Sequence, residues 1–275
     1  MPSASRALPT ASSSLRRFAT RCTASFQFSL ISPETGGTFW APPNPESPYG
    51  PPRYCLAMST VEMSTVEMST VEKSTVETLT ELEALYGVPV TMSITKEIDH
   101  LLDEHRAYVH ASPFVIVATS GPGGLDCSPR GDPAGFVRVL DQHTLLIPDR
   151  RGNNRLDTLR NIVGDPRIGL LFLVPGIGVT LRVNGTAVIS TDAELRASFA
   201  IEGKLPTTVI VVTTTSVYTQ CPKALIRSHL WDAALHRDAA DLPSVGQILA
   251  AITAGDFDGH SYDAAYPERI VQTIY

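Results

Sequence analysis

The stretch Phe114-Val115-Ile116-Val117-Ala118-Thr119 decides the fold class, because it is a continuous β-branched run that ends at a glycine- and proline-rich turn. Similar patterns recur downstream. We expect short strands near residues 126–129, 135–140 and 144–147, and longer strands over 167–174, 180–190 and 208–218. One well-marked helix, residues 153–163, interrupts them. The order predicts a mainly β barrel with flanking helices rather than a doubly wound α/β sheet.

Helical patterns flank this region on both sides. Leucines at positions 79, 82 and 85 predict a short amphipathic helix that ends at the Gly87-Val88-Pro89 turn. An apolar stripe predicts a second helix over residues 96–109, and two more helices are expected over 244–253 and 262–274. We therefore place the globular domain at residues 78–275.

Residues 1–77 have the composition of a leader, a disordered linker and an exact pentapeptide repeat that begins at Met58. The first 33 residues contain four arginines and no acidic residue, which resembles an organellar transit peptide. The alternatives are a poorly constrained terminus and a wrongly assigned start codon, with translation beginning inside the repeat. A start at Met1 predicts a mitochondrial or other organellar location, and a later start predicts the cytoplasm.

The composition argues against several classes of protein. The net charge of −6 is unlike that of a nucleic-acid binder, and no apolar run is long enough to span a bilayer. The four cysteines form no CxxC pair, which favours a reducing compartment. His100, His105 and His110 are five residues apart, so they rotate around a helix, and we expect no metal site.

The first candidate cluster is Ser128-Pro129-Arg130-Gly131-Asp132, between two expected strands. The guanidinium of Arg130 could form a bidentate pair with a phosphate or a carboxylate. The alternative is an ordinary turn in which Arg130 pairs with Asp132 or Asp126.

The second cluster, Asp149-Arg150-Arg151-Gly152-Asn153-Asn154-Arg155, opens the helix expected over residues 153–163. The N-terminus of a helix carries unpaired N–H groups and the positive end of the dipole, where arginines are unfavourable. Three arginines there indicate a bound anion that neutralises them. The alternative is a solvated basic loop.

The third cluster follows the last long strand, from Gln220 to Trp231. Lys223 and Arg227 are four residues apart and share one face of a helical turn, while Trp231 offers a flat apolar surface for stacking. For Cys221 a buried structural role is more common than catalysis.

These clusters occur in a fixed order together with Asp165-Pro166-Arg167-Ile168-Gly169-Leu170 and Thr180-Leu181-Arg182-Val183-Asn184-Gly185. The set resembles the pyridoxamine 5'-phosphate oxidase-like FMN-binding proteins, in particular a subgroup whose substrate is unassigned. The resemblance covers about Thr95 to Asp232. It implies a split β-barrel that forms a homodimer, with two FMN molecules at the dimer interface.

The resemblance also implies site residues, none of them catalytic. The FMN phosphate would be held by Arg130, Asn153, Asn154 and Arg155. The isoalloxazine ring would lie beside the backbone of Val117, Ala118 and Thr119. The flavin or the substrate would be faced, from the same or the other subunit, by Lys223, Arg227 and Ser228.

One departure from the family bears on the substrate. Pyridoxamine 5'-phosphate oxidases end with an arginine–histidine motif that grips the substrate phosphate, and residues 269–275 here contain no such motif. The sequence therefore predicts an FMN-dependent oxidoreductase for an unidentified small molecule. Two alternatives stay open: a non-catalytic flavin- or haem-binding protein, and a structural dimer whose basic loops pair with its own carboxylates.

Overall fold

The computed structural model describes residues 74–275, and Val76–Tyr275 form one structural unit. The predicted leader and linker, and nearly all of the repeat, lie outside the described residues, as do the features on which the predicted location depends. The fold is described for residues 74–275 alone.

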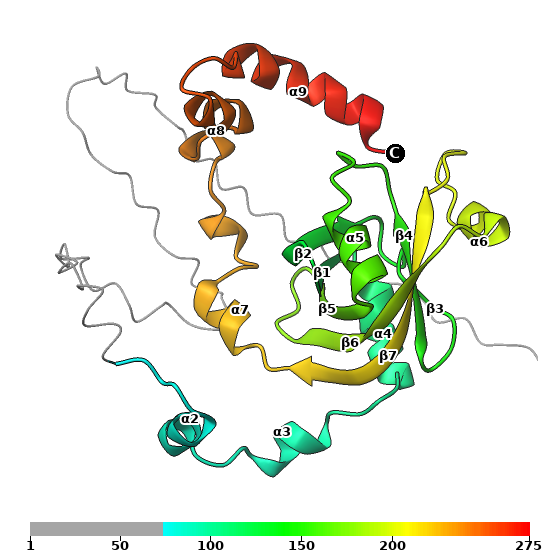
Figure 1. The fold of residues 1–275 in the computed structure, drawn as a ribbon, viewed down its shortest axis with the longest axis vertical. Coiled ribbons are helices and arrows are strands. Elements are labelled where there is room, and N and C mark those ends of the chain that lie inside the picture. The colour runs from blue at the N-terminus through cyan, green and yellow to red at the C-terminus, as the bar shows by residue number, and fades with distance from the viewer. Residues whose placement is uncertain (1–73) are drawn as a thin grey trace, which may run out of the picture. The chain divides into compact units, whose positions relative to one another are not determined.

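Seven strands form a single antiparallel sheet (Figure 1). In chain order they are β1 (Phe114–Gly121), β2 (Gly124–Gly131), β3 (Arg138–Val139), β4 (Thr144–Asp149), β5 (Arg167–Leu173), β6 (Thr180–Ser190) and β7 (Thr208–Gln220). Their order across the sheet is β2-β1-β5-β6-β7-β4-β3. The expected mainly β fold with flanking helices is confirmed.

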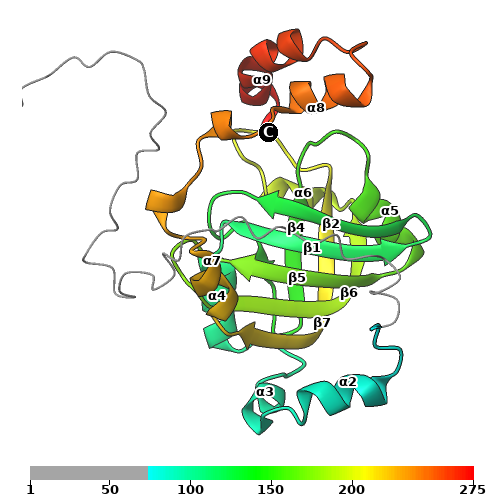
Figure 2. The ribbon, with the colours of Figure 1, turned by 90° about the vertical axis from the view of Figure 1, so that its left-hand side faces the viewer.

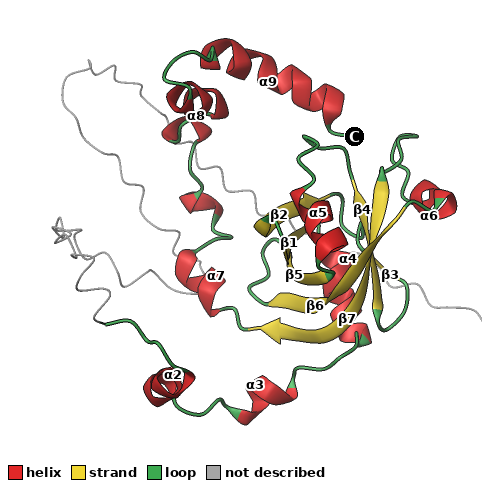
Figure 3. Cartoon of the chain, viewed as in Figure 1, coloured by secondary structure: helices red, strands yellow, loops and turns green. Residues whose placement is uncertain are grey.

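Helices precede, interrupt and follow the sheet (Figure 3). They are α2 (Leu79–Tyr86), α3 (Thr91–Thr95), α4 (Asp103–Ala111), α5 (Asp157–Gly164), α6 (Ala193–Ser198), α7 (Lys223–Ser228), α8 (Val245–Ile252) and α9 (Gly259–Thr273). The helix α6 had no predicted counterpart.

The sheet is strongly curved, and its concave side encloses the core (Figure 2). Alternate residues of β5, among them Ile168, Leu170 and Phe172, are buried, as the two-residue period of a strand requires. A bulge between β6 and β7 bends the sheet further, and there a Cβ on Gly185 would lie 2.0 Å from the Thr213 carbonyl oxygen. This position accepts only glycine.

The helix predicted over residues 96–109 is wrong in its first half. The main chain of Ile98 instead pairs with Val217 of β7, so this segment is extended, and α4 begins at Asp103. Pairing with a distant strand overrides the local helical pattern. His105 is buried, and burial lowers the pKa of its imidazole.

The first helix is confirmed in extent, since α2 covers Leu79–Tyr86 and ends at Gly87. Its apolar stripe, however, contains no buried residue: Leu79 is 76% exposed and Leu85 is 70% exposed. Within the described residues, the apolar stripe of α2 therefore packs against no other apolar surface.

No helix among residues 74–275 combines the length and apolar character needed to cross a bilayer. No group of three or more histidine, cysteine, aspartate or glutamate side chains in this range is arranged to hold a metal ion.

Candidate functional site

A cavity of about 960 Å³ unites the first two clusters predicted from the sequence. Its walls come from the end of β2, the loop between β4 and α5, and the start of β7. Arg130, Asn153, Asn154 and Arg155 all line it, as predicted for a shared site. Its volume lies in the range of small-molecule sites, about 300–1,000 Å³.

Arg130 is held from three sides at the edge of this cavity. Its guanidinium donates to Thr158 Oγ1 at 3.2 Å and lies 3.5 Å from the Asp149 carboxylate. It also donates to the carbonyl oxygen of Pro129. Burial raises the pKa of Asp149, and the attraction of Arg130 only partly opposes this shift. Arg130 is therefore ordered before any ligand arrives.

Arg150 forms the most buried ion pair of the described residues with Asp132. Its Nε donates to Asp132 Oδ2 at 2.7 Å, and the two side chains are 16% and 4% exposed. A second donation reaches the carbonyl oxygen of Phe199 at 2.9 Å. This pair joins the end of β2 to the end of β4 and forms a rigid side of the cavity.

The loop between β4 and α5 differs from its prediction. The helix begins at Asp157, so Asn153, Asn154 and Arg155 precede it and do not form its first turn. The acidic Asp157 occupies the first turn, as the helix dipole favours, and it pairs with Arg155 at 2.8 Å. The prediction of a bound anion from arginines in the first turn of this helix is therefore wrong.

The backbone of this loop is nevertheless unusual. Asn154 has a φ of 61° and Leu156 has a φ of 62°, both in the left-handed region. Asparagine tolerates that region, but for leucine it costs about 1–2 kcal/mol. Both residues line the cavity. Strain of this kind often accompanies ligand sites, where the surrounding structure maintains it.

The charges around the cavity leave a positive surplus. Four arginines line it, at positions 130, 150, 151 and 155, against three aspartates, at positions 132, 149 and 157. Arg151, within the described part of the chain, has no carboxylate partner. Thr208 Oγ1, also in the lining, is buried without a hydrogen-bond partner among these residues. An anionic ligand would satisfy this arrangement.

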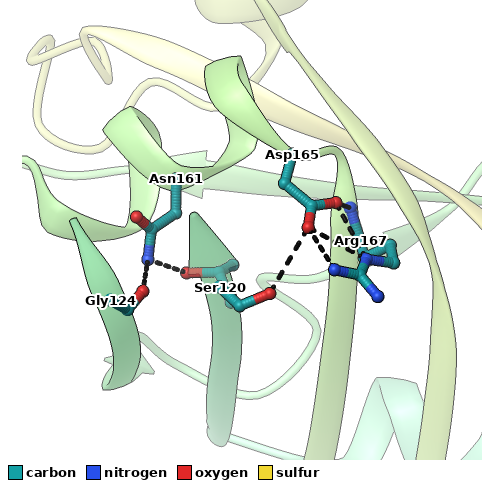
Figure 4. Close-up of polar contacts among 6 residues, drawn as sticks. Ser120, Gly124, Asn161, Asp165 and Arg167 are labelled. Carbon is teal, nitrogen blue, oxygen red and sulfur yellow. Dashed lines mark hydrogen bonds and ion pairs between the residues drawn. The ribbon is translucent and has the colours of Figure 1, made fainter. Parts of the chain in front are cut away.

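A buried polar contact fixes α5 against the hairpin of β1 and β2 (Figure 4). Asn161 Nδ2 donates to Thr119 Oγ1 at 3.3 Å and to the Gly124 carbonyl oxygen at 3.1 Å. At the end of the helix, Asp165 accepts from Ser120 and from Arg167 (Figure 4). These contacts position the loop that carries the arginines and asparagines.

The strand segment predicted to lie beside a ring does not line the cavity. Val117 is fully buried in the core and Thr119 is 5% exposed, while the side chain of Ala118 points to solvent. A role for the backbone of these three residues stays a prediction.

The third cluster also lies apart from the cavity within one chain. Lys223, Arg227 and Ser228 lie on α7, and all three are exposed. Trp231 donates its indole N–H to the Ile177 carbonyl oxygen at 2.9 Å. Cys221, for which the more common buried role was favoured, is exposed. The structure therefore joins only the first two of the three clusters.

Sequence reasoning missed several residues of the site. Ile274 and Tyr275 line the cavity although the chain places them far from the other lining residues. Thr158 links Arg130 to Asp126, to whose carboxylate it donates at 2.5 Å. Only the tertiary structure could reveal these contacts, because no local pattern marks them.

Comparison with protein families identifies the domain that carries this site. Residues 101–221, somewhat less than half of the chain, match the family model described as pyridoxamine 5'-phosphate oxidase. This domain belongs to the pyridoxamine 5'-phosphate oxidase-like family, and the resemblance drawn from the motifs is confirmed. Comparison with curated protein sequences finds no match.

Several solved structures are similar to part of the chain. Group A Streptococcus HupZ is 18% identical over 44% of this chain and 94% of its own, with a TM-score of 0.37. A Clostridium acetobutylicum protein related to general stress protein 26, of the pyridoxinephosphate oxidase family, is 14% identical over 44% and 94%, with a TM-score of 0.31. The FAD binding protein of Mycobacterium smegmatis is 13% identical over 45% and 97%, with a TM-score of 0.30.

Proposed function

We propose that this protein binds FMN in the cavity between β2 and the loop that precedes α5, and that it is a flavin-dependent oxidoreductase for a small molecule. The observation that carries the proposal is the surplus of arginines around a cavity of about 960 Å³. Membership of the pyridoxamine 5'-phosphate oxidase-like family supports it.

The residues present fit the two ends of FMN. The phosphate would be held by Arg130, Arg155 and the amides of Asn153 and Asn154, because guanidinium and amide N–H groups match phosphate oxygens. The ring would find apolar surface in the same lining, at Phe136, Pro148, Leu156 and Leu159.

When bound, FMN supplies the electron and hydride transfer, while the protein supplies position and electrostatics. Thr158 and Asp149 would orient the guanidinium of Arg130 toward the phosphate. The buried Arg150–Asp132 pair would keep that wall of the cavity fixed. The substrate stays unassigned, since no described residue is placed by its contacts as an acid, base or nucleophile.

We further propose that the active form is a homodimer. Lys223, Arg227 and Ser228 do not reach the cavity of their own chain, so a contribution from them requires a second copy. Mixing Arg227→Ala protein with Arg130→Ala protein tests this. FMN sites formed between the two variants would support a shared site, and the absence of any recovery would contradict it.

The test of the function is titration of the full-length apoprotein with FMN, followed by fluorescence quenching and by the absorption spectrum. Binding at micromolar concentration is expected, with riboflavin much weaker because it lacks the phosphate. Equal affinity for riboflavin and FMN would contradict a phosphate site, and no binding of either would overturn the proposal.

Turnover is a separate measurement on the FMN complex. Anaerobic addition of NADH or NADPH should bleach the flavin spectrum, with dithionite as the positive control. Flavin that binds but is reduced only by dithionite would favour a non-catalytic flavoprotein. Haem bound more tightly than FMN would favour the haem-binding alternative.

A further inference from the structure

The last two residues of the sequence belong to the cavity wall. Ile274 and Tyr275 follow α9, which packs against α8 through the Ser244–Asp263 contact. They nevertheless line the same cavity as the arginine-rich loop. A segment remote in sequence therefore completes the site.

The side chain of Tyr275 contacts the buried ion pair of the cavity. Its ring centroid lies 5.7 Å from Arg150 Cζ, within the range of a cation–π contact. Its hydroxyl lies near the Asp132 carboxylate. Burial and this carboxylate raise the pKa of the Tyr275 hydroxyl, so it stays protonated at neutral pH.

This base is rigid. Asp132 accepts from Arg150 at 2.7 Å, and Arg150 also donates to the carbonyl oxygen of Phe199. The ring of Tyr275 thus lies beside the guanidinium of Arg150, with its hydroxyl near Asp132. An aromatic side chain fixed in this way loses little further freedom when a ligand packs against it.

The charge distribution shows which part of a ligand belongs on this side. Arg150 and Asp132 neutralise each other, so the ring of Tyr275 lies beside a paired arginine. The surplus positive charge lies with Arg151 and with the loop that carries Arg155. An anionic group is therefore favoured at the loop, and a flat ring at Tyr275.

We propose that Tyr275 is a ligand-contacting residue whose ring packs against the planar ring system of the bound cofactor, and that the Asp132–Arg150 pair positions it. The inference rests on the proposed flavin site and adds its aromatic wall.

The test compares FMN dissociation constants and dissociation rates of the full-length protein with those of Tyr275→Ala, Tyr275→Phe and Val271→Ala. Val271 is the matched control, because it lies on α9, is 76% exposed and does not line the cavity. Tyr275→Ala should weaken FMN binding about 3- to 10-fold, mainly through faster dissociation, as expected for one lost aromatic contact. Tyr275→Phe should stay within about 2-fold of the wild type because it keeps the ring.

The outcomes separate this inference from the proposed function. Wild-type protein that binds no FMN would overturn both. If FMN binds tightly and Tyr275→Ala leaves its affinity unchanged, the proposed contact of Tyr275 with the cofactor ring is wrong, while the proposed flavin site stands. If Tyr275→Phe is as weak as Tyr275→Ala, the hydroxyl group contributes to binding and the ring does not, against the inference. An equal loss in Val271→Ala would assign the effect to α9 as a whole, again against the inference.

Discussion

Replacement of Arg130 separates a phosphate site from a purely structural ion pair. Its guanidinium lies 3.5 Å from the Asp149 carboxylate, and the two side chains are 22% and 14% exposed. Unit charges at this distance attract by about 5 kcal/mol at an effective dielectric constant of about 20, and by about 1 kcal/mol in water. Because water still reaches this pair, Arg130→Ala should lower the free energy of unfolding by about 1–3 kcal/mol.

The cost of Arg130→Ala should also depend on pH. Burial raises the pKa of Asp149 above its ordinary value of 3.8 even with Arg130 present, and removal of the guanidinium raises it further. A raised folded-state pKa means that the contribution of Asp149 to stability is fully present below about pH 3.8 and is lost as the pH rises through the folded-state value. Arg130→Ala should therefore destabilise the protein more at pH 7 than near pH 4.

Binding should respond differently from stability. Loss of a charge-assisted bond to phosphate, about 1.5–3 kcal/mol, raises the dissociation constant of FMN by about 10- to 150-fold. The double variant Arg130→Ala with Asp149→Asn removes the stranded charge, so it should regain most of the stability while FMN binding stays weak. Urea unfolding at two pH values and FMN titration measure both quantities.

Two results would refute this reasoning. Arg130→Ala with wild-type FMN affinity would show that the guanidinium does not bind the phosphate. If the double variant recovers FMN affinity together with stability, Arg130 acts only by pairing with Asp149, which supports the structural alternative. The single variant Asp149→Asn completes the comparison and measures the contribution of the carboxylate alone.

Three further predictions concern stability, each measured by urea unfolding. Arg150→Ala should lower the free energy of unfolding by about 2–4 kcal/mol because it leaves the buried Asp132 carboxylate without its partner. Arg155→Ala should have a much smaller effect because its ion pair is exposed, and equal losses would contradict this ranking. Gly185→Ala should cost at least about 2 kcal/mol, because its Cβ would lie 2.0 Å from the Thr213 carbonyl oxygen, and a neutral effect would mean that the bulge relaxes. Hydrogen bonds from Arg167 lower the pKa of Asp165 to about 2, so its contribution to stability is present above about pH 3.8 and is lost as the pH falls toward 2. Asp165→Asn should remove this part of the acid dependence of unfolding. An unchanged dependence of stability on pH would contradict this prediction.

Much of the fold follows from local patterns. The run that starts at Phe114 is β1, and the strand predicted over 180–190 coincides with β6, because alternating β-branched residues leave few other ways to bury an apolar face. The segment 96–102 is one exception. Its apolar spacing suits a helix, but the pairing of Ile98 with Val217 decides its conformation, and no local pattern carries that information.

For the two predicted phosphate-binding clusters, too, the sequence predicts one part of the site and distant contacts decide the other. The sequence by itself marked Arg130 and the Asn153–Arg155 segment, since basic groups beside turns are costly unless an anion or a carboxylate compensates them. Only the tertiary structure shows that β2 and the loop before α5 share one cavity. It also shows that the aspartates take up most of that charge, because ion pairs form through space between distant strands.

The sequence determined the family and the chemical character of the first two clusters, because both depend on residue types in a fixed order. The tertiary structure decided which residues meet. It brings Tyr275 to the Arg150–Asp132 pair and leaves Lys223 and Arg227 away from the cavity of their own chain. The physical reason is that the curvature of the sheet and the packing of the terminal helices set these distances, and both arise from contacts between segments far apart in the chain.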